Sequence, residues 1–258
     1  MKISPLTVGF GAVVEDIDLK NLEAGVAEKL QQAVLDYGLL VVRDQILTPK
    51  QQVDVSGMFG TLETFHGQAS RDALPQIFRV ASRIDDGHTD VGRYWHSDGS
   101  FRVVPTAMSI WYSVAQPEKG GETMFTDQQR AYETLSDATQ QEIQNLVTLH
   151  RNGVAHPLVM AHPKTGIKGI YLNVGLTSDI EGLSATEADA LIDRLNMHLS
   201  RPGAVYAHEW LPGDFVLSDS FRVAHHATST PSKYRRVLDR TTVRGNAAFW
   251  DQDNKMTA

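Results

Sequence analysis

The order of the predicted secondary-structure elements limits the fold more than any other feature of this sequence. Residues 39–42, 106–114 and 236–243 are rich in β-branched and aromatic residues and predict strands. Apolar residues at helical spacing predict helices over 26–37 and 184–199. Strands and helices do not alternate regularly, as a parallel βαβ fold would require. The order favours an α+β fold with an antiparallel core and helices packed outside, for which a jelly roll (double-stranded β-helix) is one solution.

Polar residues mark where further helices begin. Ser184 and Glu187 form a capping-box pattern in front of apolar residues at helical spacing. The stretch 127–148 also predicts helix, with Thr126 and Ser136 as the caps of two short segments.

The composition restricts the class of protein and of metal site. The 258 residues show no internal repeat or linker, so we expect one domain over residues 1–258. A net charge of −7 without a basic block argues against nucleic acid as a partner. No apolar run could span a membrane and the first residues lack the core of a signal peptide, so we expect a cytoplasmic protein. The absence of cysteine leaves nitrogen and oxygen ligands, which favours iron(II), manganese or zinc.

The motif His96-Ser97-Asp98 is the first candidate metal pair. On a strand, alternate residues project to one face, so the imidazole and the carboxylate can point into a barrel mouth together. The spacing alone is weak, because the chain holds a second such motif, His88-Thr89-Asp90. A salt-bridged histidine at a strand end is the alternative interpretation.

The pair His225-His226 offers a third ligand. Adjacent residues on a strand point in opposite directions, so only one of the two imidazoles would face a metal. A surface histidine pair is equally consistent with this pattern.

Two arginines follow on the predicted strand 236–243. Arg236 and Arg240 are separated by an even number of positions and share one face of that strand. An inward guanidinium needs an anion, and a carboxylate is its natural bidentate partner. A surface salt bridge is the alternative.

Taken together, a series of motifs in this order resembles the taurine dioxygenase family of iron(II)- and 2-oxoglutarate-dependent oxygenases. The resemblance covers roughly residues 3 to 245. Its blocks are Arg43-Asp44-Gln45 with Leu47-Thr48-Pro49 and Phe59-Gly60; Trp95-His96-Ser97-Asp98; Gly120-Gly121-Glu122-Thr123; His156-Pro157 with His162-Pro163 and Tyr171-Leu172-Asn173; and Pro212-Gly213-Asp214, Asp219 and His225-His226-Ala227-Thr228.

The resemblance implies a metal site with open coordination positions. His96, Asp98 and His225 take the places of the family's facial triad, since His225 keeps the six-residue step from Asp219. The motif His88-Thr89-Asp90 has no counterpart. Because Asp98 keeps the carboxylate that related halogenases lack, halogenation is disfavoured.

The resemblance also implies how the co-substrate and the substrate are held. Arg236 matches the arginine that grips the distal carboxylate of 2-oxoglutarate, and Thr123 matches the hydroxyl that assists it. Arg240 matches a position that helps to hold the substrate's anionic group.

The sequence departs from the family around the last ligand and in one earlier segment. Ser218-Asp219-Ser220 stands where the family frequently has Trp-Asp-Asn. An arginine usually follows that asparagine, but here Phe221 follows Ser220 and Arg222 is displaced by one position. The stretch between about 130 and 155 is shorter than in many members. We expect these changes near the rim of the active site, where they weaken any transfer of taurine or chlorophenoxyacetate specificity.

The implied activity is oxidation of a small anionic substrate, such as an amino-acid-derived metabolite, by dioxygen (O2). Hydroxylation, C–X cleavage and desaturation remain open, each with conversion of 2-oxoglutarate to succinate and CO2. The alternatives are a taurine- or alkylsulfonate-scavenging dioxygenase and a non-catalytic jelly-roll protein that binds a small ligand. Relatives of this kind are often dimers or tetramers, so a homo-oligomer is one of the open alternatives, while the sequence itself does not indicate the oligomeric state.

Overall fold

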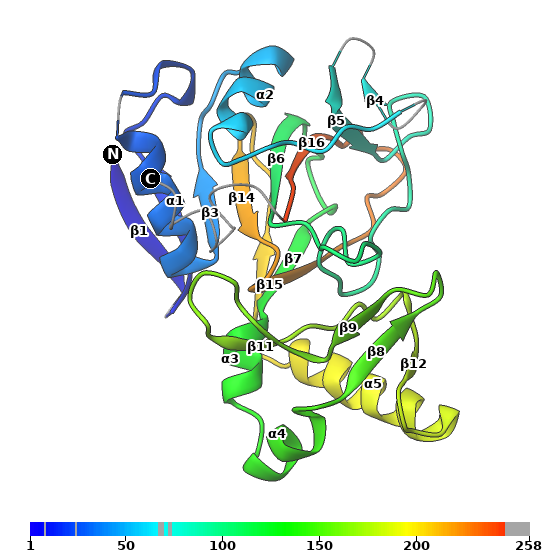
Figure 1. The fold of residues 1–258 in the computed structure, drawn as a ribbon. Coiled ribbons are helices and arrows are strands. Elements are labelled where there is room, and N and C mark those ends of the chain that lie inside the picture. The colour runs from blue at the N-terminus through cyan, green and yellow to red at the C-terminus, as the bar shows by residue number, and fades with distance from the viewer. Residues whose placement is uncertain (8, 24, 67–69, 72–73, 246–258) are drawn as a thin grey trace.

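The computed structural model describes residues 1–7, 9–23, 25–66, 70–71 and 74–245. An eight-stranded, mostly antiparallel sheet forms the larger wall of the molecule (Figure 1). Its strands lie in the order β1 (Lys2–Thr7), β2 (Phe10–Glu15), β3 (Leu39–Val42), β14 (Phe215–Asp219), β6 (Met108–Ala115), β16 (Val237–Val243), β5 (Leu74–Ala81) and β4 (Ser70–Arg71). Among the described strands of this sheet, β2 and β3 are the one pair that runs parallel.

A three-stranded sheet packs against the inner face of the large one. It consists of β13 (Val205–His208), β7 (Thr123–Asp127) and β15 (Val223–Ala227). Trp111 of β6 meets Phe125 of β7 edge to face at 5.9 Å, and Val41, Val216 and Val223 join the same buried cluster. These two facing sheets are the jelly-roll core, as the sequence predicted.

Two helices cover the outer face of the large sheet. Helix α1 (Val26–Tyr37) packs Leu30 and Val34 against Leu40 and Val42, whose side chains alternate with those facing inward. Helix α2 (Pro49–Gly57) adds to the same cluster and has a capping box at its N-terminus. A short 3₁₀ helix, η1 (Leu19–Asn21), lies between β2 and α1.

The residues between β7 and β13 form what we call the insert, the lower part of the view in Figure 1. It has its own buried apolar cluster, to which helix α5 contributes most. Its elements are α3 (Gln128–Glu133), α4 (Asp137–Ile143), β8 (Val147–His150), β9 (Ala155–Pro157), β10 (Val159–Ala161), β11 (Lys168–Ile170), β12 (Thr177–Ile180) and α5 (Ala185–Leu199).

Two of the three predicted helix caps are confirmed. Ser184 with Glu187 forms the capping box of α5, and Ser136 caps α4. The prediction for Thr126 is wrong, because Asp127 caps α3 by accepting from the amides of Gln129 and Arg130. Thr126 lies inside β7 with neighbouring strands on both sides, so it cannot begin a helix. None of the described helices is long and apolar enough to cross a membrane.

Candidate metal centre and co-substrate site

Three predicted ligand side chains meet between the two sheets. His225 lies in the middle of β15, and the backbone of His96 pairs with it in an isolated antiparallel bridge. Asp98 follows in a turn, so the His96–Asp98 pair lies at a single bridge and not on a full strand. One ligand atom from each side chain lies within 4.8 Å of the others. Within the described part of the chain, this is the one group of three or more such side chains.

Two of the three ligands are oriented by a hydrogen-bond partner. His96 Nδ1 lies 2.8 Å from the carbonyl oxygen of Tyr94, which favours the tautomer with a free Nε2 lone pair. Ser109 Oγ donates to Asp98 Oδ2 at 2.6 Å. The Nε2 atoms of His96 and His225 lie 3.8 and 3.9 Å from the two Asp98 oxygens.

Electrostatics fix the protonation states that metal binding needs. Burial lowers the pKa of His96 and lowers that of His225 well below its ordinary value. Burial alone would raise the pKa of Asp98, but Arg240 and the two imidazoles hold it below its ordinary range. Two neutral imidazoles and one ionised carboxylate are the donor set that iron(II) takes in a facial arrangement, so the residues fit the implied metal.

The other predicted histidines lie elsewhere. His88 stacks on Phe78 with ring centroids 4.6 Å apart, and Asp90 pairs with Arg93, so the second His-x-Asp motif forms no cluster. His226 points away from the ligands and meets the edge of the Trp95 ring at 4.5 Å. The opposite directions of His225 and His226 follow from the strand geometry, as predicted.

Arg236 lies in the same cavity as two of the ligands, next to Thr123. The cavity is small, about 30 Å³, and its lining includes His96, His225, Thr123, Arg236 and Arg240. Arg236 Nη2 donates to Thr123 Oγ1 at 3.0 Å, and its buried Nε has no hydrogen-bond partner among the described residues. Burial lowers the pKa of Arg236 to about 10. A buried guanidinium with an unused donor fits the distal carboxylate of 2-oxoglutarate.

Thr123 is arranged to donate. Its Oγ1 accepts from Arg236 Nη2 and also from Trp210 Nε1, both at 3.0 Å. Because a hydroxyl has two lone pairs and one proton, these bonds leave the proton of Thr123 available to a bound carboxylate.

Arg240 lies closer to the metal ligands than the sequence suggested. Its Nη1 is 2.6 Å from Asp98 Oδ1, and its guanidinium lies over the Phe78 ring. Arg236 and Arg240 both line the cavity, whereas Asp239 between them points away and pairs with Arg79. The predicted common face of the two arginines is therefore present.

Residues of the insert hydrogen-bond to the loop that carries His96 and Asp98, which we call the ligand loop. The sequence did not indicate these contacts. Asn173 Nδ2 donates to Ser100 Oγ at 2.7 Å, and His156 Nε2 lies 2.7 Å from the Ser100 carbonyl oxygen. On the other side of the ligand pair, Trp95 Nε1 donates to Ser200 Oγ at 2.7 Å. Asn173 belongs to a family motif, but nothing in its sequence context indicates this partner.

The residues around Asp219 support the backbone. His162 Nε2 lies 2.8 Å from Asp219 Oδ2, while Asp219 Oδ1 accepts from the amide of Phe221. These contacts fix the connection from β14 to β15, the strand that carries His225.

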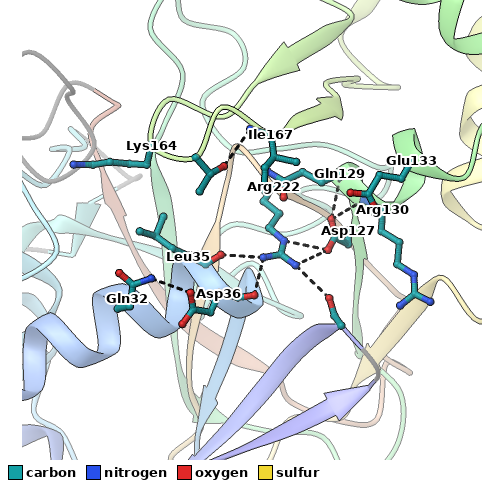
Figure 2. Close-up of a pocket in the computed structure, with 12 residues that line it drawn as sticks. Gln32, Leu35, Asp36, Asp127, Gln129, Arg130, Glu133, Lys164, Ile167 and Arg222 are labelled. Carbon is teal, nitrogen blue, oxygen red and sulfur yellow. Dashed lines mark hydrogen bonds and ion pairs between the residues drawn. The ribbon is translucent and has the colours of Figure 1, made fainter.

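The departures at Phe221 and Arg222 do not lie at the active-site rim, which corrects the expectation from sequence. Phe221 is buried against His162. Arg222 lines a separate cavity of about 890 Å³ (Figure 2), where it binds Asp127 and the carbonyl oxygens of Leu35, Asp36 and Gly9. The connection from β14 to β15 runs toward the end of α1, so Arg222 helps to pack this connection against the helix. The lining of this cavity includes none of the candidate metal ligands.

Comparison with known proteins agrees with this geometry. The model of the taurine catabolism dioxygenase TauD, TfdA family matches residues 2–242. The (S)-phenoxypropionate/alpha-ketoglutarate-dioxygenase of Sphingobium herbicidovorans is 30% identical, over 95% of this chain and 96% of that protein. The alpha-ketoglutarate-dependent 2,4-dichlorophenoxyacetate dioxygenase of Cupriavidus pinatubonensis is also 30% identical, over 95% and 98%.

Solved structures share the fold over nearly the whole chain. A taurine dioxygenase from Burkholderia xenovorans superposes with a TM-score of 0.85 at 28% identity, covering 94% of this chain and 89% of that one. AAD-2, solved with Mn(II) and N-oxalylglycine, gives a TM-score of 0.84 at 28% identity, covering 94% and 98%.

The fold, the His–Asp–His group and these relatives define an iron(II)- and 2-oxoglutarate-dependent dioxygenase. Within that class, the chain belongs to the taurine catabolism dioxygenase TauD, TfdA family.

Proposed function

We propose that this enzyme oxidises a small anionic substrate next to the candidate metal group, at the cavity that Arg236 and Arg240 line. The observation that carries the proposal is the buried His96, Asp98 and His225 group beside a buried arginine with an unused donor. When bound, the iron activates dioxygen, with 2-oxoglutarate supplying two electrons and leaving as succinate and CO2.

The protein's own residues would bind and orient the metal, 2-oxoglutarate and the substrate, and would keep water out of the site. His96, Asp98 and His225 would hold the metal on one face. Arg236, with the hydroxyl of Thr123, would hold the distal carboxylate of 2-oxoglutarate. Arg240 would attract the anionic group of the substrate, and the buried apolar side chains of Trp111 and Leu238, which line the cavity, would limit the access of water.

For the substrate we propose an amino-acid-derived metabolite. Names of relatives support a second candidate, an aryloxyalkanoate, because two of them act on phenoxypropionate or dichlorophenoxyacetate. The third candidate substrate is taurine or another alkylsulfonate, which the enzyme would scavenge. The alternative to an enzymatic function is a non-catalytic protein that binds a small ligand. All three substrate classes carry the anion that Arg240 would bind.

Anaerobic addition of iron(II) and 2-oxoglutarate tests the site. We expect the weak visible charge-transfer band of the iron chelate, lost on His96→Ala. A band that persists in His96→Ala, or none in the wild type, would overturn the proposed site.

A substrate screen tests the reaction. Amino-acid derivatives, aryloxyalkanoates and alkylsulfonates are compared for stimulation of succinate release. Stimulation by taurine alone would exclude the amino-acid proposal, and no succinate with any compound would favour a binding protein.

Three further proposals concern the whole molecule. We propose that residues 1–258 act as one domain, that the enzyme is cytoplasmic, and that it forms a homo-oligomer without nucleic-acid or membrane partners. Analytical ultracentrifugation would test the oligomer, and cell fractionation the location.

A further inference from the structure

Asp98 lies next to both the candidate metal ligand His96 and the guanidinium of Arg240. Its Oδ1 lies 3.8 Å from His96 Nε2, within the candidate metal group, and 2.6 Å from Arg240 Nη1. Both side chains of the Asp98–Arg240 pair are largely buried, with 9% and 12% exposed. A guanidinium and a divalent metal would therefore meet at one carboxylate, where water screens their repulsion little.

Arg240 is held by fewer polar contacts than Arg79, which lies nearby on β5. Among the described residues, Asp98 is the one carboxylate at ion-pair distance from Arg240, and the buried Nε has no hydrogen-bond partner. The guanidinium otherwise rests on the face of Phe78, 4.8 Å from the ring centre. Arg79, by contrast, binds both oxygens of Asp239. A guanidinium with one anionic partner and an unused donor can accept a second anion without breaking a network.

We propose that Arg240 exchanges partners between Asp98 and the substrate's anionic group, and so couples metal loading to substrate recognition. A metal bound to Asp98 neutralises the carboxylate and weakens its attraction for Arg240. The released donors then serve the substrate anion. Because such coupling is reciprocal, an anion bound at Arg240 also strengthens metal binding. This inference rests on the proposed metal site and on the substrate role of Arg240.

Metal affinity tests the exchange without any turnover. Purified protein treated with a chelator is titrated with Mn(II), and free Mn(II) is followed by electron paramagnetic resonance. A neighbouring opposite charge changes the proton affinity of a carboxylate by about 10- to 1000-fold, so we expect Arg240→Gln to bind Mn(II) about tenfold more tightly than wild type. General damage to the fold would weaken binding, so the expected direction separates the two effects.

Arg236→Gln is the matched control. It removes an equal charge from the same cavity but from an arginine without an ion pair to Asp98. We expect a clearly smaller change than for Arg240→Gln. Equal tightening in both variants would indicate a general charge effect and overturn the exchange, as would unchanged or weaker binding in Arg240→Gln.

Chemical modification of the wild type gives a second readout that needs no variant. Butanedione labels accessible guanidinium groups, and peptide mass spectrometry follows each arginine. We expect Mn(II) to increase the labelling of Arg240 and to leave Arg222, which is bound at the distant cavity, unchanged. Unchanged labelling of Arg240 in Mn(II)-loaded protein would overturn the exchange while leaving the metal site intact. Failure of the wild type to bind Mn(II) would overturn both.

Discussion

His96 and His225 form a single antiparallel β-bridge in which each backbone amide donates to the other's carbonyl oxygen, at 3.1 and 2.9 Å. The bridge sets the two imidazoles side by side, with ring centroids 4.3 Å apart. Backbone register, and not side-chain flexibility, therefore fixes the spacing of two metal ligands. The proposed site is preorganised in the sense that its nitrogen ligands need no backbone movement to meet a metal.

The neighbouring histidine provides a matched control for the third ligand. We expect His225→Ala to abolish the iron–2-oxoglutarate charge-transfer band, because it removes a ligand. His226→Ala should keep the band, since His226 packs on Trp95 on the opposite side. Anaerobic absorption spectra of both variants check this, and equal loss in the two would contradict the assignment of His225.

Thr123→Val tests the hydroxyl beside Arg236. The change keeps the shape but removes the acceptor of two hydrogen bonds and the hydroxyl proton that we propose to serve 2-oxoglutarate. We expect the KM for 2-oxoglutarate to rise about tenfold, the equivalent of about 1.4 kcal/mol for a lost hydrogen bond to a charged group. Thr123→Ser should restore most of the affinity, and an unchanged KM in Thr123→Val would contradict the assigned role.

Asn173→Ala tests the contact between the insert and the ligand loop. Asn173 is buried, donates to Ser100 and accepts from the amides of Gly175 and Leu176. We expect a loss of about 2–3 kcal/mol in unfolding free energy, because buried partners are left unsatisfied.

The exposed Asn152, which donates to the Phe101 carbonyl oxygen, is the control for Asn173. Asn152→Ala should lose less than about 1 kcal/mol. Denaturant melts measure both variants, and equal effects would contradict a special role for Asn173.

The pH dependence of stability should report His208. Burial lowers the pKa of His208 despite the nearby Asp214 carboxylate, 3.0 Å away. Since the unfolded chain takes up this proton more readily, unfolding free energy should fall as pH drops below about 6.5, by up to about 1.4 kcal/mol per pH unit. Asp214 acts in the same direction at lower pH, because contacts with His208 and Arg43 outweigh burial and lower its pKa. Urea melts between pH 7.5 and 5 should show a shallower slope in His208→Asn, and an equal slope would contradict this account.

Local patterns predicted most of the fold and part of the site, while partners distant in sequence were not predictable. The shared face of Arg236 and Arg240 follows from strand periodicity, which a sequence displays directly. Strand periodicity does not account for the His96–Asp98 pair, because Asp98 lies in a turn after the single bridge of His96. The ion pair of Arg240 with Asp98 joins residues 142 positions apart, and no local pattern contains it. The displacement of Arg222 likewise depends on where the end of α1 lies, which only the tertiary packing determines.

Sequence patterns were also imprecise at element boundaries. Thr126 and Asp127 are both good helix caps by residue type. The choice between them depends on how far β7 extends, and this is set by its pairing with β13 and β15.

The insert departs from the end of β7 and returns in β13, the antiparallel neighbour of that same strand, where Val205 faces Thr126. Its two ends therefore stay together whatever length of chain lies between them. Loops within it can lengthen or shorten during evolution without moving a strand of the jelly roll. The contacts of Asn173 and His156 with Ser100 set the limit to that freedom, because those two residues must keep reaching the loop that carries Asp98. Such an arrangement lets a lineage remodel the insert while its oxidation chemistry is inherited unchanged.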